Sequence, residues 1–210
     1  MGMIGNRRLF VNALTLSRVP LIAGFCAAAV FGELRGSLAL EILACALMLL
    51  AGLSDLFDGM LARRWRVVSF FGKMADPLMD KVFFVVSFPL LLWLAGEQGD
   101  PVHAAVLLVF TILWILRDLW VTFMRSIASA YGANVAAMWT GKVRTALSFP
   151  AAGLIYMYLA FHGRFAAAWQ GPALAAVYAI EGALVLLNLW SFAVYTLAYR
   201  PHLRRALERE

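Results

Sequence analysis

Six long apolar segments dominate this sequence. Short polar breaks separate them, and they cover roughly residues 9–31, 37–61, 75–96, 102–130, 143–162 and 171–199. A helix needs about 20 largely apolar residues to cross the hydrocarbon core of a bilayer, and each segment is long enough to do so. The sequence therefore predicts an all-α integral membrane protein with six transmembrane helices. Arg7 and Arg8, which precede Leu9 and Phe10, predict a short interfacial helix before the first span.

Composition and charge placement support a membrane environment. The chain is 63% hydrophobic and 14% charged, whereas a soluble domain carries about 25% charged residues. Neither an internal repeat nor a soluble segment is evident, so we expect one membrane domain over residues 1–210. The net charge of +6 comes from Lys and Arg at the ends of the apolar segments. This placement is typical of topology signals, argues against nucleic-acid binding, and predicts that both termini face the cytoplasm.

Four aspartates lie where charge is costly. Asp55 and Asp58 fall near the end of the second segment, and Asp76 and Asp80 open the third. A carboxylate inside a membrane costs about 2.5–3.5 kcal/mol even on permissive scales, so such residues generally serve a function. Each pair shares one helical face, and a tight loop is expected to turn the two faces toward each other. Because four carboxylates repel one another, they require cations, and oxygen-only ligation favours two Mg²⁺ or Mn²⁺ ions.

Small residues and one cation are interleaved with these aspartates. Gly59, Ala62 and Gly72 leave space for a ligand to approach the helix backbone, and Arg63 offers a positive charge to a phosphate. Helix packing is the alternative explanation for each small residue taken singly. Their position among the carboxylates favours a ligand site.

The run from Asp55 to Asp80 resembles the CDP-alcohol phosphotransferase signature, DxxDGxxAR…GxxxDxxxD, at every fixed position. The resemblance implies two divalent ions held on a CDP diphosphate by Asp55, Asp58, Asp76 and Asp80. It implies a cytidine and phosphate site lined by Asp55, Gly59, Ala62, Arg63 and Gly72. It also implies a homodimer in which Asp80 is the general base, an acceptor hydroxyl attacks the phosphorus nearer the lipid, and CMP leaves. Spacing alone does not decide which aspartate takes the proton.

Basic residues in the second half of the chain predict the type of acceptor. Arg117 and Arg125 lie in the fourth apolar segment, and Lys142 and Arg144 open the fifth. A buried cation is costly unless it meets an anion, so this group predicts a phosphate-bearing acceptor. The alternatives are that Arg117 pairs with a buried acid, or that Lys142 and Arg144 only mark a loop.

Three segments resemble bacterial phosphatidylglycerophosphate synthases, which use CDP-diacylglycerol and sn-glycerol 3-phosphate. The segments are residues 12–18, residues 117–125 and residues 141–145. This resemblance adds Thr15 and Arg18 to the acceptor phosphate site, and it implies a bacterial inner membrane with the active site on the cytoplasmic side. Asp118 departs from it, because those synthases more often have Glu there.

Other acceptors and other functions are alternatives. Cardiolipin synthases of this type, which use phosphatidylglycerol, also carry Arg-Asp at residues 117–118, and an inositol phosphate is a further candidate acceptor. A metal-dependent prenyltransferase normally separates its two aspartate motifs widely, whereas both halves here fall within 26 residues. A transporter often contains inverted repeats, and none is evident.

Four more ionisable residues have simpler interpretations. Glu41 and Glu181 lie inside apolar segments and are expected to be interhelical partners of Arg or backbone groups. His103 and His162 lie at the edges of loops and are expected to be solvated.

Overall fold

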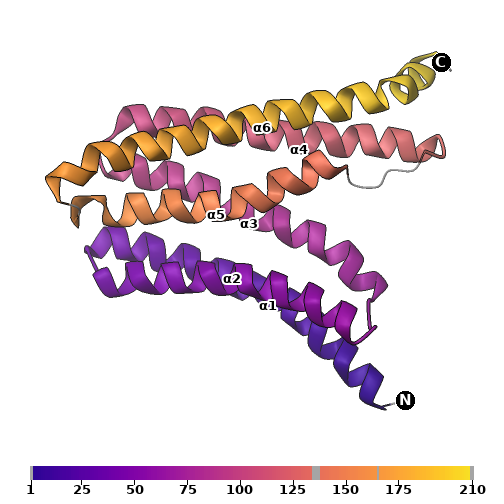
Figure 1. The fold of residues 1–210 in the computed structure, drawn as a ribbon, viewed down its shortest axis with the longest axis horizontal. Coiled ribbons are helices and arrows are strands. Elements are labelled where there is room, and N and C mark those ends of the chain that lie inside the picture. Colours follow the sequence, from indigo (N-terminus) through magenta and orange to yellow (C-terminus); the bar gives the residue numbers. More distant parts are fainter. Residues whose placement is uncertain (1, 134–137, 165, 209–210) are drawn as a thin grey trace. The chain divides into compact units, whose positions relative to one another are not determined.

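The computed structural model describes residues 2–133, 138–164 and 166–208, and its regular elements are all helical (Figure 1). In chain order they are α1 (Gly2–Arg35), α2 (Leu38–Arg64), α3 (Phe70–Glu97), α4 (Pro101–Ala130), α5 (Trp139–Phe161), the 3₁₀ turn η1 (His162–Arg164) and α6 (Ala167–Leu207). Within the described chain, six helices are long and apolar enough to cross a membrane. The predicted six-span, all-α fold is therefore confirmed.

The first helix has no break near its start. It runs continuously from Gly2, so a separate interfacial helix is not confirmed. The Arg7 guanidinium lies 5.6 Å from the centre of the Trp65 ring, and the rings of Phe10 and Trp65 are 6.1 Å apart. The beginning of α1 thus packs against the residue that follows α2.

Apolar and polar side chains are distributed as expected for a protein in lipid. Large apolar residues such as Leu56, Phe70, Leu119 and Leu186 are more than 60% exposed. Lipid tails cannot hydrogen-bond, so polar groups in the spans must find partners inside the protein. A set of polar or charged residues is accordingly buried, and it includes Thr15, Arg18, Asp58, His103, Arg117, Arg144, Glu181, Asn188 and Ser191.

The chain forms two compact units. The first consists of Met1–Asp100 and Ala152–Arg164, and the second of Pro101–Ala151 and Phe165–Glu210, so that α5 contributes to both. In the first unit α1 packs against α2 and α3, and in the second α4 packs against α6 (Figure 1). A single domain over residues 1–210 stays a prediction.

Charged residues link the helices within each unit. In the first, Arg164 Nη1 lies 2.6 Å from Glu41 Oε2. In the second, His103 Nε2 lies 2.7 Å from Glu181 Oε1, and both residues are 1% exposed. The interhelical roles expected of Glu41 and Glu181 are confirmed. The expectation that His103 is solvated was wrong, because α6 brings a carboxylate to it.

The second unit has a hydrophobic core between α4 and α6. It contains Val121, Met124, Ala128, Tyr195 and Tyr199. The Tyr195 hydroxyl also accepts a hydrogen bond of 2.9 Å from the backbone N–H of Met138, just before α5 begins. This contact ties the start of α5 to α6.

Candidate functional site

The four aspartates come from two helices whose ends are set by local sequence. Asp55 and Asp58 lie near the end of α2, and Asp76 and Asp80 lie in the first turns of α3. Ser69 caps α3: its Oγ accepts a 2.9 Å hydrogen bond from the N–H of Gly72 and donates a 2.9 Å hydrogen bond to Asn12 Oδ1. The cap thus ties the start of α3 to α1.

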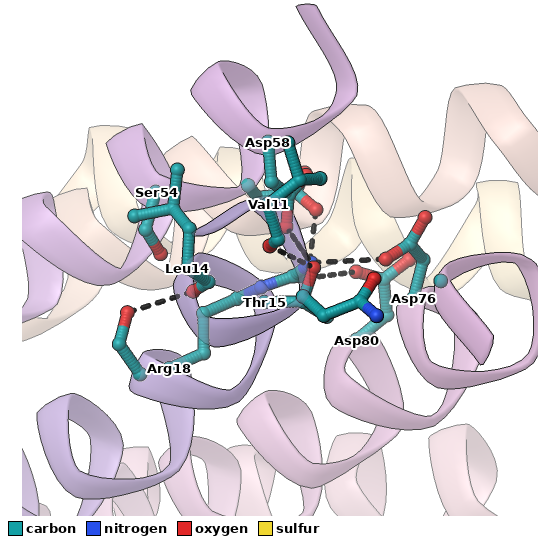
Figure 2. A network of polar contacts seen from close by, with 12 residues as sticks. Val11, Leu14, Thr15, Arg18, Ser54, Asp58, Asp76 and Asp80 are labelled. Carbon is teal, nitrogen blue, oxygen red and sulfur yellow. Dashed lines mark hydrogen bonds and ion pairs between the residues drawn. The ribbon is translucent and has the colours of Figure 1, made fainter. Parts of the chain in front are cut away.

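An arginine from a third helix lies at the centre of the aspartates (Figure 2). Arg18 projects from α1 and is 3% exposed. Its guanidinium contacts all four carboxylates: Nη1 lies 2.7 Å from Asp55 Oδ1 and 3.7 Å from Asp80 Oδ1, and Nη2 lies 2.6 Å from Asp58 Oδ2 and 3.3 Å from Asp76 Oδ1. One positive charge is therefore shared by four negative charges.

The four carboxylates differ in exposure. The Asp58 side chain is 3% exposed and also accepts a 2.7 Å hydrogen bond from Thr15 Oγ1. The side chains of Asp55, Asp76 and Asp80 are 46%, 46% and 40% exposed. Asp58 is thus held by α1, whereas the other three remain accessible to a ligand.

The sequence predicted that the acidic faces of α2 and α3 would turn directly toward each other. In the structure a side chain of α1 contacts the carboxylates of both helices. The helix α1 packs against both α2 and α3, and Arg18 lies between their carboxylates. The reason is electrostatic, since like charges at this distance need a cation between them. The sequence predicts that Thr15 and Arg18 bind the acceptor phosphate, and that role stays a prediction.

The donor set suits hard divalent cations. Its ligand atoms are all carboxylate oxygens, which Mg²⁺ and Mn²⁺ prefer. Within the part of the chain that the structure describes, no three Asp, Glu, His or Cys side chains already stand in an arrangement that would hold one ion. The fit to such a metal comes from the carboxylate oxygens themselves and from the exposure of Asp55, Asp76 and Asp80, and Arg18 contacts these carboxylates in the structure.

The small residues predicted for the nucleotide site lie beside these aspartates. A Cβ atom on Gly59 would lie 3.4 Å from Arg63 Nη1, so the glycine leaves room for the exposed Arg63 guanidinium. A Cβ on Gly72 would lie 3.2 Å from the Ser69 cap hydroxyl. Ala62 is half-buried in the last turns of α2. Gly72 thus has a structural reason to be small, whereas Gly59 allows Arg63 to fold back over its own helix.

The basic residues of the second unit are held by protein partners. Asp118 Oδ1 accepts from Arg117 Nη1 at 2.9 Å and from Arg144 Nη2 at 2.5 Å. Arg144 also donates to Asn188 Oδ1 at 3.1 Å, and Arg117 donates to the Ser191 hydroxyl. Arg117 is thus paired with an acid, the half-buried Asp118, and pairing with an acid was one of the two interpretations of this residue.

Aromatic rings complete this arginine cluster. The Arg144 guanidinium lies 3.8 Å from the centre of the Trp114 ring, and that of Arg117 lies 5.0 Å from the Tyr195 ring. Arg125 is half-buried on α4, and Lys142 is exposed near the start of α5. The predicted acceptor residues are therefore distributed over the two units, with Thr15 and Arg18 in the first and the other four in the second.

The polar face of α6 was not predicted from the sequence. Asn188 and Ser191 are buried and contact the two arginines, and Asn188 Nδ2 donates to the backbone oxygen of Leu113 at 3.0 Å. Their i, i+3 spacing within an apolar segment, in line with Glu181 seven residues before Asn188, is a signal that could have identified this face.

Comparisons with known proteins converge on one family. Residues 8–198 match the family model described as CDP-alcohol phosphatidyltransferase. The chain is 34% identical to a Mycoplasma genitalium CDP-diacylglycerol–glycerol-3-phosphate 3-phosphatidyltransferase over 66% of this chain and 56% of that relative. It is 30% identical to a probable phosphatidylglycerophosphate synthase of Mycobacterium tuberculosis, over 85% and 75% of the two lengths. An Escherichia coli relative with the same name as the Mycoplasma protein is 29% identical over 90% of this chain and 94% of its own length.

Proposed function

The chain belongs to the CDP-alcohol phosphatidyltransferase family, and we propose that it transfers a phosphatidyl group from CDP-diacylglycerol to sn-glycerol 3-phosphate, releasing CMP. The observation that carries this proposal is the likeness to relatives named for that reaction, one of which is matched over 94% of its length. The family's signature residues gather around one point of the first unit, where three carboxylates are accessible.

The chemistry assigned to the chain is a proton transfer coupled to nucleophilic attack. The acceptor hydroxyl oxygen attacks the phosphorus nearer the lipid, the bond from that phosphorus to the phosphate oxygen of CMP breaks, and CMP leaves with the electron pair. We assign the hydroxyl proton to Asp80. Its contact with Arg18, at 3.7 Å, is the longest of the four, so its carboxylate is the one least tightly held by that guanidinium, and its side chain is 40% exposed.

Metal and nucleotide are assigned to the same region. The family generally depends on a divalent cation. Two Mg²⁺ or Mn²⁺ ions held by Asp55, Asp58, Asp76 and Asp80 would supply the charge that neutralises the diphosphate and stabilises the leaving CMP. Arg63, folded over Gly59, is the cation proposed for a CDP phosphate. Ala62 and Gly72 complete the proposed nucleotide contacts.

The acceptor phosphate is assigned to basic residues. The residues proposed are Arg117, Arg125, Lys142 and Arg144, of which Arg117 and Arg144 share Asp118. Two guanidinium groups against one carboxylate still leave a net positive charge, which favours an anion nearby. Thr15 and Arg18 are assigned to the acceptor on the family resemblance alone.

The protein is a multi-pass membrane protein, and we assign it to a bacterial inner membrane. Exposed arginines near both termini and after α2 favour a cytoplasmic location for the termini and the aspartate site. A homodimer is the proposed assembly.

The test uses the full chain purified in detergent with CDP-diacylglycerol and Mg²⁺ or Mn²⁺. CMP release and the lipid product are measured with glycerol 3-phosphate, phosphatidylglycerol or an inositol phosphate as acceptor. We expect turnover only with glycerol 3-phosphate, and turnover with phosphatidylglycerol instead would assign cardiolipin synthesis. Asp55→Asn should abolish metal-dependent turnover, whereas Glu97→Gln, at an exposed acid that ends α3, should leave it unchanged. Full activity of Asp55→Asn would contradict the metal assignment.

A further inference from the structure

Arg18 has an unusual electrostatic position. Its guanidinium is buried, and the side chain is 4% exposed, beneath three carboxylates that are 40–46% exposed. With all four aspartates ionised, the group that they form with Arg18 carries three net negative charges. The oxygens that contact Arg18 belong to the same four residues that are proposed to hold the divalent cations.

We propose that Arg18 is an internal counter-cation that competes with divalent metal for the four aspartates. In the protein without substrate, the guanidinium stabilises the carboxylates and lowers their affinity for metal. This inference rests on the proposed function, because it requires that the aspartates are the metal ligands. In this role Arg18 acts on the metal through the carboxylates, in addition to the acceptor contact proposed for it above.

Charge balance favours competition between Arg18 and divalent metal for the four aspartates over binding of both at once. Two divalent ions neutralise four carboxylates completely, so a guanidinium left within 4 Å of the same oxygens no longer meets a net negative charge and lies close to two cations. The guanidinium must therefore lose its contacts when metal binds, or the metal binds less tightly. A diphosphate-bearing substrate reverses this balance, because it brings negative charge that a displaced guanidinium can contact. Metal and nucleotide should consequently bind more tightly together than singly.

A purely structural Arg18 makes a different prediction. If it only holds α1 against α2 and α3, its loss lowers stability to the same extent with and without metal. A counter-cation predicts instead that its loss makes the metal-free protein less stable and the affinity for metal greater. The metal dissociation constant is therefore the measurement that separates the two roles.

The experiment titrates the full-length protein in detergent with Mn²⁺, without substrate, and follows unbound Mn²⁺ by electron paramagnetic resonance. Arg18→Gln should bind Mn²⁺ at least about tenfold more tightly than the natural protein, a difference of about 1.4 kcal/mol. The rise in unfolding temperature on adding saturating Mn²⁺ should also be larger for Arg18→Gln. Arg144→Gln is the matched control, because it removes a buried, ion-paired guanidinium that contacts none of the four aspartates. Its Mn²⁺ affinity should stay within about twofold of the natural value.

Each outcome has a defined meaning. Equal or weaker Mn²⁺ binding by Arg18→Gln, with normal binding by the natural protein, overturns the inference and leaves the proposed function standing. Failure of both proteins to bind Mn²⁺ removes the metal assignment and the inference with it. If Arg18→Gln does not fold, Arg18→Lys replaces it. Lysine retains the charge but presents one ammonium instead of two forked nitrogens, so Mn²⁺ binding tighter than that of the natural protein supports competition, and equal or weaker binding contradicts it.

Discussion

Asp118→Asn tests a carboxylate of the second unit that two buried arginines share. One carboxylate oxygen accepts from Arg117 at 2.9 Å and from Arg144 at 2.5 Å, and the two arginine side chains are only 7% and 5% exposed. Asparagine keeps the shape of aspartate but removes its charge. The variant therefore leaves two buried guanidinium groups without the carboxylate that they share.

The size of the effect follows from burial. Removing one partner of a buried ion pair costs about 3–5 kcal/mol, because the remaining charge stays desolvated. Asp118 is 19% exposed, and an asparagine oxygen can still accept one hydrogen bond, so we expect the lower end, about 3 kcal/mol. In a protein of this length, 1 kcal/mol shifts the unfolding temperature by about 2–4 °C, which gives a decrease of about 6–12 °C.

The assay is thermal unfolding in detergent, followed by tryptophan fluorescence. Removing the second charge as well, in Asp118→Asn with Arg144→Gln, should cost less than the sum of the two single changes by about 1–3 kcal/mol. Glu97→Gln, at an exposed position, should change stability by less than about 0.5 kcal/mol. An unfolding temperature of Asp118→Asn within about 1 °C of the natural protein, or strict additivity of the double variant, would refute the shared-carboxylate explanation.

Two further predictions concern the acceptor and a close contact. Arg125→Ala should raise KM for glycerol 3-phosphate at least about tenfold while changing KM for CDP-diacylglycerol less than about twofold. The measurement is steady-state kinetics with each substrate varied in turn, and an equal rise in both KM values would contradict the prediction. Gly141→Ala should destabilise the protein by about 1–3 kcal/mol, since the new Cβ would lie 2.8 Å from the Tyr195 hydroxyl, which is held by Met138. Gly182→Ala, where the Cβ meets open space, is the control, and equal unfolding temperatures for the two variants would show that Tyr195 moves aside at little cost.

The outline of the fold was accessible from sequence because it depends on local composition. Each span is a continuous apolar stretch of about the length that a bilayer requires, and no knowledge of its neighbours is needed to recognise it. The position of the aspartates was accessible for the same reason, since Asp55 with Asp58 and Asp76 with Asp80 repeat at helical spacing. Arg63 beside Gly59 follows from the same i, i+4 geometry.

The partners of the charged residues were not accessible in this way. His103 looks like a loop-edge residue in sequence, yet it is buried against Glu181, 78 residues later. In the sequence, Asp118 differs from the related synthases only in being Asp where they more often have Glu. In the structure it joins Arg117 of α4 to Arg144 of α5. Periodicity identifies the face of a helix that carries charge, but it does not identify the helix that packs there.

Arg18 marks this division most clearly. The sequence by itself determined six membrane-spanning helices and four aspartates that must meet a cation. Only the tertiary structure showed that the guanidinium of Arg18 in α1 is one of the positive charges that contact them. Arg18 lies 40 residues before Asp58 and 58 before Asp76 in the chain. The physical reason is that hydrophobic length and helical spacing are properties of one segment. The neutralisation of buried charge, in contrast, depends on which segments pack together.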